Sequence, residues 1–149
     1  MKTKPITFLL SLTFLFLLGG SVYGEEPEVK RLYYDSGKLK SEFHFKNGKQ
    51  VELATGWYES GGKELEIHFK NGKQEGLVTG WYESGAKKDE IHYKNGKTEG
   101  LEPLWYKDGR KWGIRHYKNG IENGLRKEWD KNGKLVFEGN FVDGVEEIK

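Results

Sequence analysis

The chain has 149 residues and no cysteine, so neither disulfide bonds nor thiol chemistry is available to it. It carries 25 basic and 23 acidic residues, and both signs are interleaved along the chain. Because no continuous basic stripe exists to follow a phosphate backbone, we expect no nucleic acid partner.

The first 24 residues have the pattern of a secretory signal peptide. Lys2 and Lys4 precede an apolar segment, residues 6–18, and small residues follow before Glu25. A segment of this length is shorter than the roughly 20 residues that span a bilayer as a helix. We therefore expect export to the periplasm or the extracellular space. Membrane anchoring by an uncleaved signal is the alternative.

The rest of the chain repeats with a strict period. Aromatic residues, glycines and Asn-Gly or Asp-Gly pairs each recur every 24 residues, without insertion or deletion. We call the equivalent positions of successive units a column. The column that begins the units is apolar: Val29, Leu53, Leu77, Leu101 and Leu125. A fixed period of this size is typical of repeat architectures. We divide the chain into five units: 29–52, 53–76, 77–100, 101–124 and 125–148.

Each unit contains two short apolar runs separated by glycine-bearing turns. In the third unit, residues 77–82 read LVTGWY and end at Glu83-Ser84-Gly85, where glycine suits a short hairpin with a bulge. The second run, residues 89–94, ends in Asn95-Gly96, the strongest short-range hairpin signal. The pattern predicts an all-β fold, an elongated antiparallel sheet of consecutive hairpins that stabilise one another.

Alternation along a strand sorts the side chains onto two faces. We expect Leu77 and Trp81 to share an apolar face with Ile91 and Tyr93 and with their equivalents in other units. The opposite face would carry the tyrosines that follow the tryptophans, Tyr58, Tyr82 and Tyr106, together with the columns of glutamate, histidine and lysine. The sequence thus predicts one apolar face and one polar face that is also aromatic.

Two units depart from the common pattern. Pro103 lies in a first strand and cannot donate to the ladder, so we expect a bulge or weakened pairing there. The fifth unit has Asp130, Gly139 and Asn140 in the tyrosine, isoleucine and histidine columns, as expected of a terminal cap.

The four histidines occupy a single column and are candidates for a binding surface: His44, His68, His92 and His116. Zinc ligands lie about 2.0 to 2.1 Å from the ion, whereas equivalent residues of adjacent units lie about 9.5 Å apart. The column cannot share one ion, and we predict no metal site. We expect repeated surface residues that pair across strands, and their joint titration near pH 6 could modulate partner binding.

The tyrosine column is the second candidate for binding: Tyr34, Tyr58, Tyr82 and Tyr106. Exposed tyrosines give large contact areas at low entropic cost, which suits recognition. Packing across strands is an equally complete explanation of the column. The tryptophan and leucine columns are interpreted as core rather than as a ligand site.

The units resemble the bacterial variant of the MORN repeat, in which a unit reads aromatic-Tyr-x-x-Gly-Lys, then a short strand, then [Phe/Tyr]-x-Asn-Gly-Lys. The resemblance covers residues 29 to 148. It implies a sheet of consecutive β-hairpins and a role in binding and scaffolding. Some bacterial members carry an antitoxin label. The chain departs from the glycine-richer eukaryotic form, so membrane or phosphoinositide roles transfer poorly.

The sequence indicates a binding protein rather than an enzyme. The mature serines lie mostly in turns, and no nucleophile elbow or phosphate-cradling loop is present. We predict no cofactor and no catalytic residue. The leading hypothesis is a secreted or periplasmic module that binds a protein partner. The alternatives are binding to an envelope glycan or lipid, and an antitoxin-like role.

Overall fold

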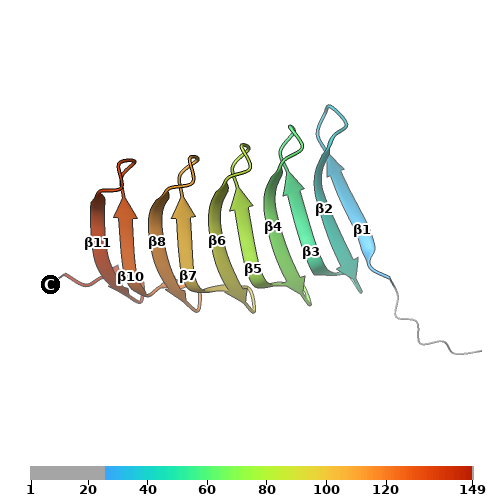
Figure 1. Cartoon of the computed structure of the whole chain (residues 1–149). Helices are drawn as coiled ribbons and strands as arrows, with labels where there is room; N and C mark the ends of the chain where they lie inside the picture. The colour runs from blue at the N-terminus through green and yellow to red at the C-terminus, as the bar shows by residue number, and fades with distance from the viewer. Residues whose placement is uncertain (1–25, 149) are drawn as a thin grey trace, which may run out of the picture.

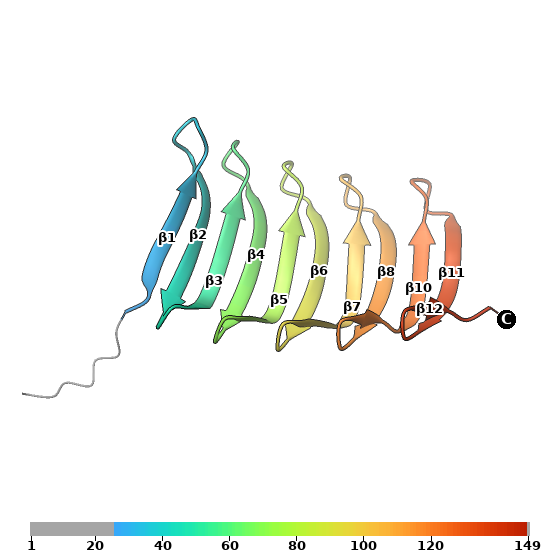
Figure 2. The same cartoon turned by 180° about the vertical axis from the view of Figure 1, so that it is seen from behind.

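The chain folds as one open antiparallel sheet. The computed structural model describes residues 26–148, which form twelve strands and, within that range, no helix. The hairpins lie side by side in chain order, in a single layer (Figure 1), and the view from behind shows no second layer over the sheet (Figure 2). The predicted all-β fold of consecutive hairpins is confirmed. The predicted signal peptide, residues 1–24, lies outside the described residues.

Five long hairpins make up the sheet, and they pair with one another in chain order. The strands of the first three hairpins are β1 (Glu28–Tyr33), β2 (Leu39–Lys46), β3 (Lys49–Trp57), β4 (Lys63–Lys70), β5 (Lys73–Trp81) and β6 (Lys87–Lys94). The remaining strands are β7 (Lys97–Trp105), β8 (Lys111–Lys118), β9 (Ile121–Glu122), β10 (Gly124–Trp129), β11 (Leu135–Val142) and β12 (Val145–Glu146). No helix that could span a membrane is found among the residues that the structure describes.

The turn inside each hairpin is a short loop closed by a left-handed glycine. In the β5–β6 hairpin, the Tyr82 amide donates to the Ala86 carbonyl and the Gly85 amide donates to the Tyr82 carbonyl, at 2.9 and 2.8 Å. Gly85 has a φ of 85°. A three-residue loop of this kind places glycine where a side chain would be strained. The predicted turn with a bulge is confirmed.

The turns that join one hairpin to the next are two-residue loops. Asn71 and Gly72 connect the paired residues Lys70 and Lys73, and both have positive φ, 53° and 79°. This backbone matches the right-handed twist of the flanking strands, which explains the recurring Asn-Gly pair. The Gly72 amide also donates to the Gln50 carbonyl at 2.8 Å, and equivalent bonds recur at the later turns. From Gly72 onward, these turns are therefore tied to the preceding hairpin.

The register contradicts the predicted assignment of faces. Leu77 pairs with His92, and Val78 pairs with Ile91. Directly paired residues share a face, so the leucine column lies with the histidines and not with the isoleucines. The reason is a bulge: two residues, Lys87 and Lys88, oppose the single residue Trp81. One extra residue moves the whole strand by one position, which exchanges its two faces.

The tryptophans also lie on the histidine side of the sheet. Glu66 pairs with Thr55 and Thr79, on the same face as His68. The Lys63 ammonium group forms an ion pair with Glu66 and lies 5.9 Å from the centre of the Trp81 ring. We use the name histidine face for the side that carries the four histidines, and isoleucine face for the side that carries Ile67 and Ile91.

Pro103 weakens one junction between hairpins, as predicted. Between β4 and β5, both Glu66 and Ile67 have a partner, whereas between β6 and β7 the pairing passes from Asp89–Leu104 to His92–Glu99. Proline lacks the amide hydrogen that this ladder requires. Pro103 still faces Ile114 within its own hairpin. The ladder between the third and fourth hairpins is thus interrupted opposite Pro103.

Candidate binding surface

A central row of side chains crosses the isoleucine face along the length of the sheet. Over the second and third hairpins, Ala54 pairs with Ile67, Ile67 with Val78, and Val78 with Ile91. Ala54, Val78 and Ile91 are buried, and Leu104 in the adjacent row is buried too. These four are the only buried apolar side chains that are found within residues 26–148. The apolar core therefore lies on this face.

An aromatic row flanks the central row on the same face. Tyr93 pairs with Gly76, Tyr117 with Gly100, and Phe141 with Gly124. Each of these glycines has a positive φ, between 85° and 116°. The isoleucine face thus combines aliphatic and aromatic side chains.

Ionised groups replace the apolar residues of the central row in the last two hairpins. Glu102 and Arg126 stand where earlier units have Ala54 and Val78, and Arg115 stands where they have Ile67 and Ile91. Glu102 and Arg115 pair directly across β7 and β8. The row therefore changes from aliphatic to charged halfway along the sheet.

These charges form a connected network. The Arg126 Nε donates to Glu128 at 2.9 Å, and its guanidinium lies 3.7 Å from Glu122. The Arg115 guanidinium lies 3.8 Å from Glu128. Aromatic rings support both arginines, since Arg115 lies over Trp112 and Arg126 lies over Phe137 and Phe141. A guanidinium over a ring gains cation–π attraction.

The network contains more acidic than basic side chains. The negative charge of two carboxyl groups is only partly balanced by nearby positive charge. Burial raises the pKa of the Glu102 carboxyl, with smaller contributions from Asp89 and Glu122, while Arg115 opposes the shift. Burial also raises the pKa of Asp89, and no ion pair or hydrogen bond joins Asp89 to another described residue. A carboxylate without a partner on a half-buried surface destabilises the fold. Such groups are typical of sites that bind something.

The predicted tyrosine column links one hairpin to the next. The hydroxyl groups of Tyr34, Tyr58, Tyr82 and Tyr106 donate to the carbonyls of Trp57, Trp81, Trp105 and Trp129, at 2.7 to 2.9 Å. All four tyrosines are half-buried. The column therefore uses its polar atoms inside the repeat, in agreement with the packing explanation.

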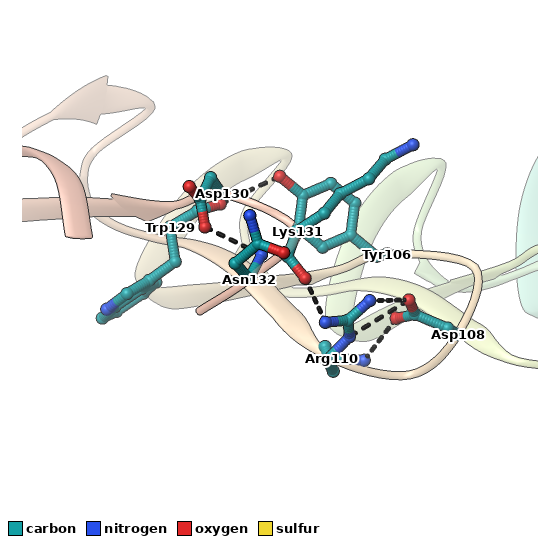
Figure 3. A network of polar contacts seen from close by, with 7 residues as sticks. All are labelled: Tyr106, Asp108, Arg110, Trp129, Asp130, Lys131 and Asn132. Atoms are coloured by element: carbon teal, nitrogen blue, oxygen red, sulfur yellow. Dashed lines mark hydrogen bonds and ion pairs between the residues drawn. The ribbon is translucent and has the colours of Figure 1, made fainter. Parts of the chain in front are cut away.

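The last of these links shows how the fifth hairpin differs (Figure 3). Tyr106 donates to the Trp129 carbonyl, while Asp130 occupies the position of the next tyrosine. The Asp130 carboxylate accepts the amides of Asn132 and Lys134, at 2.8 and 3.0 Å, inside its own turn. Arg110, held by Asp108, donates to the Lys131 carbonyl. Asp130 thus closes its own turn instead of reaching toward a further hairpin.

The predicted histidine column lies on the other face, and its members have different surroundings. His44 lies between Glu42 and Glu52, at 3.3 and 3.5 Å, and the His116 Nδ1 lies 2.6 Å from the Leu125 carbonyl. His68 and His92 are exposed. Among residues 26–148, no group of three or more potential ligands is placed to hold a metal ion. The structure does not bring the histidines and tyrosines together into one site.

The sequence did not predict the charged part of the isoleucine face. The signal was present as breaks in the apolar columns, at Glu102, Arg115 and Arg126. It was missed because the wrong register hid which columns are buried. Residues that break a repeated column against its energetic preference are expected at functional or strained sites.

Three segments of the chain match the sequence pattern of a known family, the MORN repeat variant: residues 29–47, 74–95 and 122–143. Each segment covers one hairpin, β1–β2, β5–β6 or β10–β11. No curated protein matches the chain. Among solved structures, the chain is similar to one described as the crystal structure of accessory secretory protein 1,2 and 3 in Streptococcus pneumoniae, with 14% identity and a TM-score of 0.39. That similarity covers 67% of this chain and 18% of the other.

Proposed function

We propose that this chain is a non-catalytic binding module that holds a protein partner on its isoleucine face. The observation that carries the proposal is the single layer: an apolar sheet face normally packs against a second layer of structure, and none covers this face within residues 26–148. A partner that supplies the second layer would bury the half-exposed side chains of Leu65, Ile67 and Phe69.

The size of the face suits a specific interface. Five hairpins spaced about 9.5 Å apart, with strands of eight residues, give a face of about 1,200 Å². A stable protein interface buries about 800 Å² on each partner. The residue types agree with this use, since arginine, tryptophan and tyrosine dominate the binding energy of protein interfaces. Arg115 contacts both Trp112 and Tyr117 in the fourth hairpin.

A matched pair of variants tests the proposal. Leu65→Asp places a carboxylate on the isoleucine face, at the position that the next unit fills with Asp89, so the fold already accommodates it. His68→Asp adds a carboxylate to the histidine face. Affinity capture from envelope extracts should return a stoichiometric protein with the wild type and with His68→Asp, and none with Leu65→Asp. Circular dichroism verifies that all three are folded.

Binding of purified envelope glycan or lipid vesicles in place of a protein would contradict the proposal and favour the alternative partner class. An antitoxin-like role would require that the captured partner is toxic when produced alone.

The proposed location is the periplasm or the extracellular space. It rests on the leader pattern in residues 1–24. Mass spectrometry of the protein from cells should find a chain that begins at Glu25, shorter than the 17.2 kDa precursor. A full-length chain in the membrane fraction would instead support the uncleaved anchor.

A further inference from the structure

Small residues on the isoleucine face leave a row of gaps beside the central row. The gap over Gly80 is filled by Asp89, because a Cβ at Gly80 would lie 2.9 Å from the Asp89 carboxylate. The gap over Gly113 is filled by Leu104, at 3.0 Å. At Gly56 the nearest atom would lie 3.9 Å away. The chain therefore fills this row in the third and fourth hairpins and leaves it open over Gly56.

The open gap is an apolar hollow of about 120 Å³ between β2 and β4. Its lining consists of Ser41, Phe43, Ala54, Thr55, Gly56, Leu65 and Ile67. Ser41 is the reason that the hollow exists, since the neighbouring units have Leu65 and Asp89 at that position. An apolar hollow of this size takes one aliphatic side chain, and burying such a side chain there is favourable.

A second hollow continues from the first and has charged groups at its rim. Both share Ser41, Gly56 and Leu65, and the second adds Lys40, Glu64 and Lys88. No ion pair within residues 26–148 engages any of these three charges. Two lysines face one glutamate, so the rim is positive overall. A ligand with a carboxylate near its aliphatic group matches this arrangement.

We propose that the hollow over Gly56 receives an aliphatic side chain from a polypeptide segment of the partner, and that a carboxylate beside that side chain pairs with Lys40 and Lys88. The inference rests on the proposed function, because it names where and how the protein partner begins to bind. The aliphatic side chain supplies most of the affinity. The exposed ion pairs supply orientation, because such pairs contribute little to affinity.

The sequence of the fourth hairpin indicates a substitution that would fill the hollow. Leu104 occupies in the fourth hairpin the position of Gly56 in the second, and it is buried there. Gly56 lacks a positive φ, so a side chain at this position does not strain the backbone. Gly56→Leu should therefore fold and fill the hollow from within. Lys40→Glu with Lys88→Glu reverses the charge of the rim and leaves the hollow open.

Blocked pentapeptides serve as probes in an NMR titration of the folded protein. Glu-Glu-Leu-Glu-Glu should shift the amide signals of Ser41, Gly56 and Leu65, while Glu-Glu-Ser-Glu-Glu and Lys-Lys-Leu-Lys-Lys should not. Gly56→Leu should weaken binding of the acidic leucine peptide at least tenfold. The double lysine variant should prefer the basic leucine peptide. Lys70→Glu with Lys94→Glu, an equal charge change at the far end of the strands, should keep the original preference.

Four results would overturn the inference. The first is no shift with the acidic leucine peptide, or equal shifts with the serine peptide. The second is unchanged binding by Gly56→Leu. The third is self-association of the wild type that Gly56→Leu abolishes, which would assign the hollow to a second copy of this chain. If Gly56→Leu still captures the protein partner that Leu65→Asp loses, the inference fails and the proposed function stands.

Discussion

Glycine serves two different purposes in this chain, and Gly100 and Gly56 separate them. Gly100 has a φ of 85° and no atom near its missing Cβ, so the backbone alone requires glycine there. Gly56 has ordinary strand backbone, and a Cβ there would make only normal contacts. At Gly56 the glycine contributes open space and no conformational freedom that the fold requires.

Gly100→Ala is expected to lower the free energy of unfolding by about 1 kcal/mol, because an L residue in the left-handed region is strained by that amount. Gly56→Ala is the control, since it adds the same methyl group in unstrained backbone. It should raise stability slightly, because glycine in a strand costs about 0.5 to 1 kcal/mol relative to alanine. Urea unfolding of the two variants measures both effects. Equal effects of the two substitutions would contradict this view of Gly100.

Asp89 is a carboxyl group at a position where leucine would be more stable. Asp89→Leu copies Leu65 of the preceding unit and should raise the free energy of unfolding by about 1 to 2 kcal/mol at pH 7, because it removes a partly buried charge. Chemical unfolding at pH 7 measures the gain. A less stable variant would show that the carboxylate has a compensating partner.

The same residue gives stability a defined pH dependence. Burial raises the pKa of Asp89 above its ordinary value of 3.8, so the folded state holds the proton more tightly than the unfolded state. The contribution of Asp89 to stability is therefore largest below pH 3.8 and is lost as the pH rises through the raised pKa. Unfolding of wild type and Asp89→Asn between pH 3 and 8 tests this sign. The stability difference should shift in favour of the variant as the pH rises.

Each hairpin is tied to the next by one tyrosine hydroxyl in addition to the strand ladder. Tyr82→Phe removes the hydrogen bond to the Trp105 carbonyl and should lower the free energy of unfolding by about 1 kcal/mol. Tyr93→Phe is the matched control, since no described residue bonds to that hydroxyl and the residue pairs with Gly76 across the ladder. Thermal unfolding compares the two. Loss of stability in Tyr93→Phe alone would contradict the role assigned to the tyrosine column.

The hairpins and their turns could be predicted from sequence, but the register of their strands could not. Asn71-Gly72 and Gly85 are local signals, because each turn needs positive φ at a fixed place. The bulge at Lys87 and Lys88 leaves no such local signal, and it determines which columns share a face. The predicted apolar face was wrong for leucine and tryptophan for this reason, and the open hollow over Gly56 could not be located.

The unpredicted register also limited what the sequence could predict about the candidate binding surface. The tyrosines and histidines stood out as columns, yet their contacts were not readable from spacing. The network of Glu102, Arg115 and Arg126 was visible only as interruptions of an apolar row whose burial depends on the register.

At the scale of the whole molecule, stability comes from neighbouring hairpins rather than from a central core. Only four apolar side chains are buried within residues 26–148, and each hairpin pairs with the hairpins next to it in the chain. A repeat protein of this kind has a stability that is close to a sum of unit and junction contributions. Removing one complete unit should therefore shorten the sheet without unfolding it.

Deletion of residues 73–96 tests this claim most directly, because it removes one hairpin and restores an Asn-Gly-Lys turn at the seam, from Gly72 to Lys97. Small-angle X-ray scattering of the deleted chain should show a folded particle whose longest dimension is shorter by about 9.5 Å, the width of two strands. An unfolded chain, or a folded particle of unchanged length, would contradict the account.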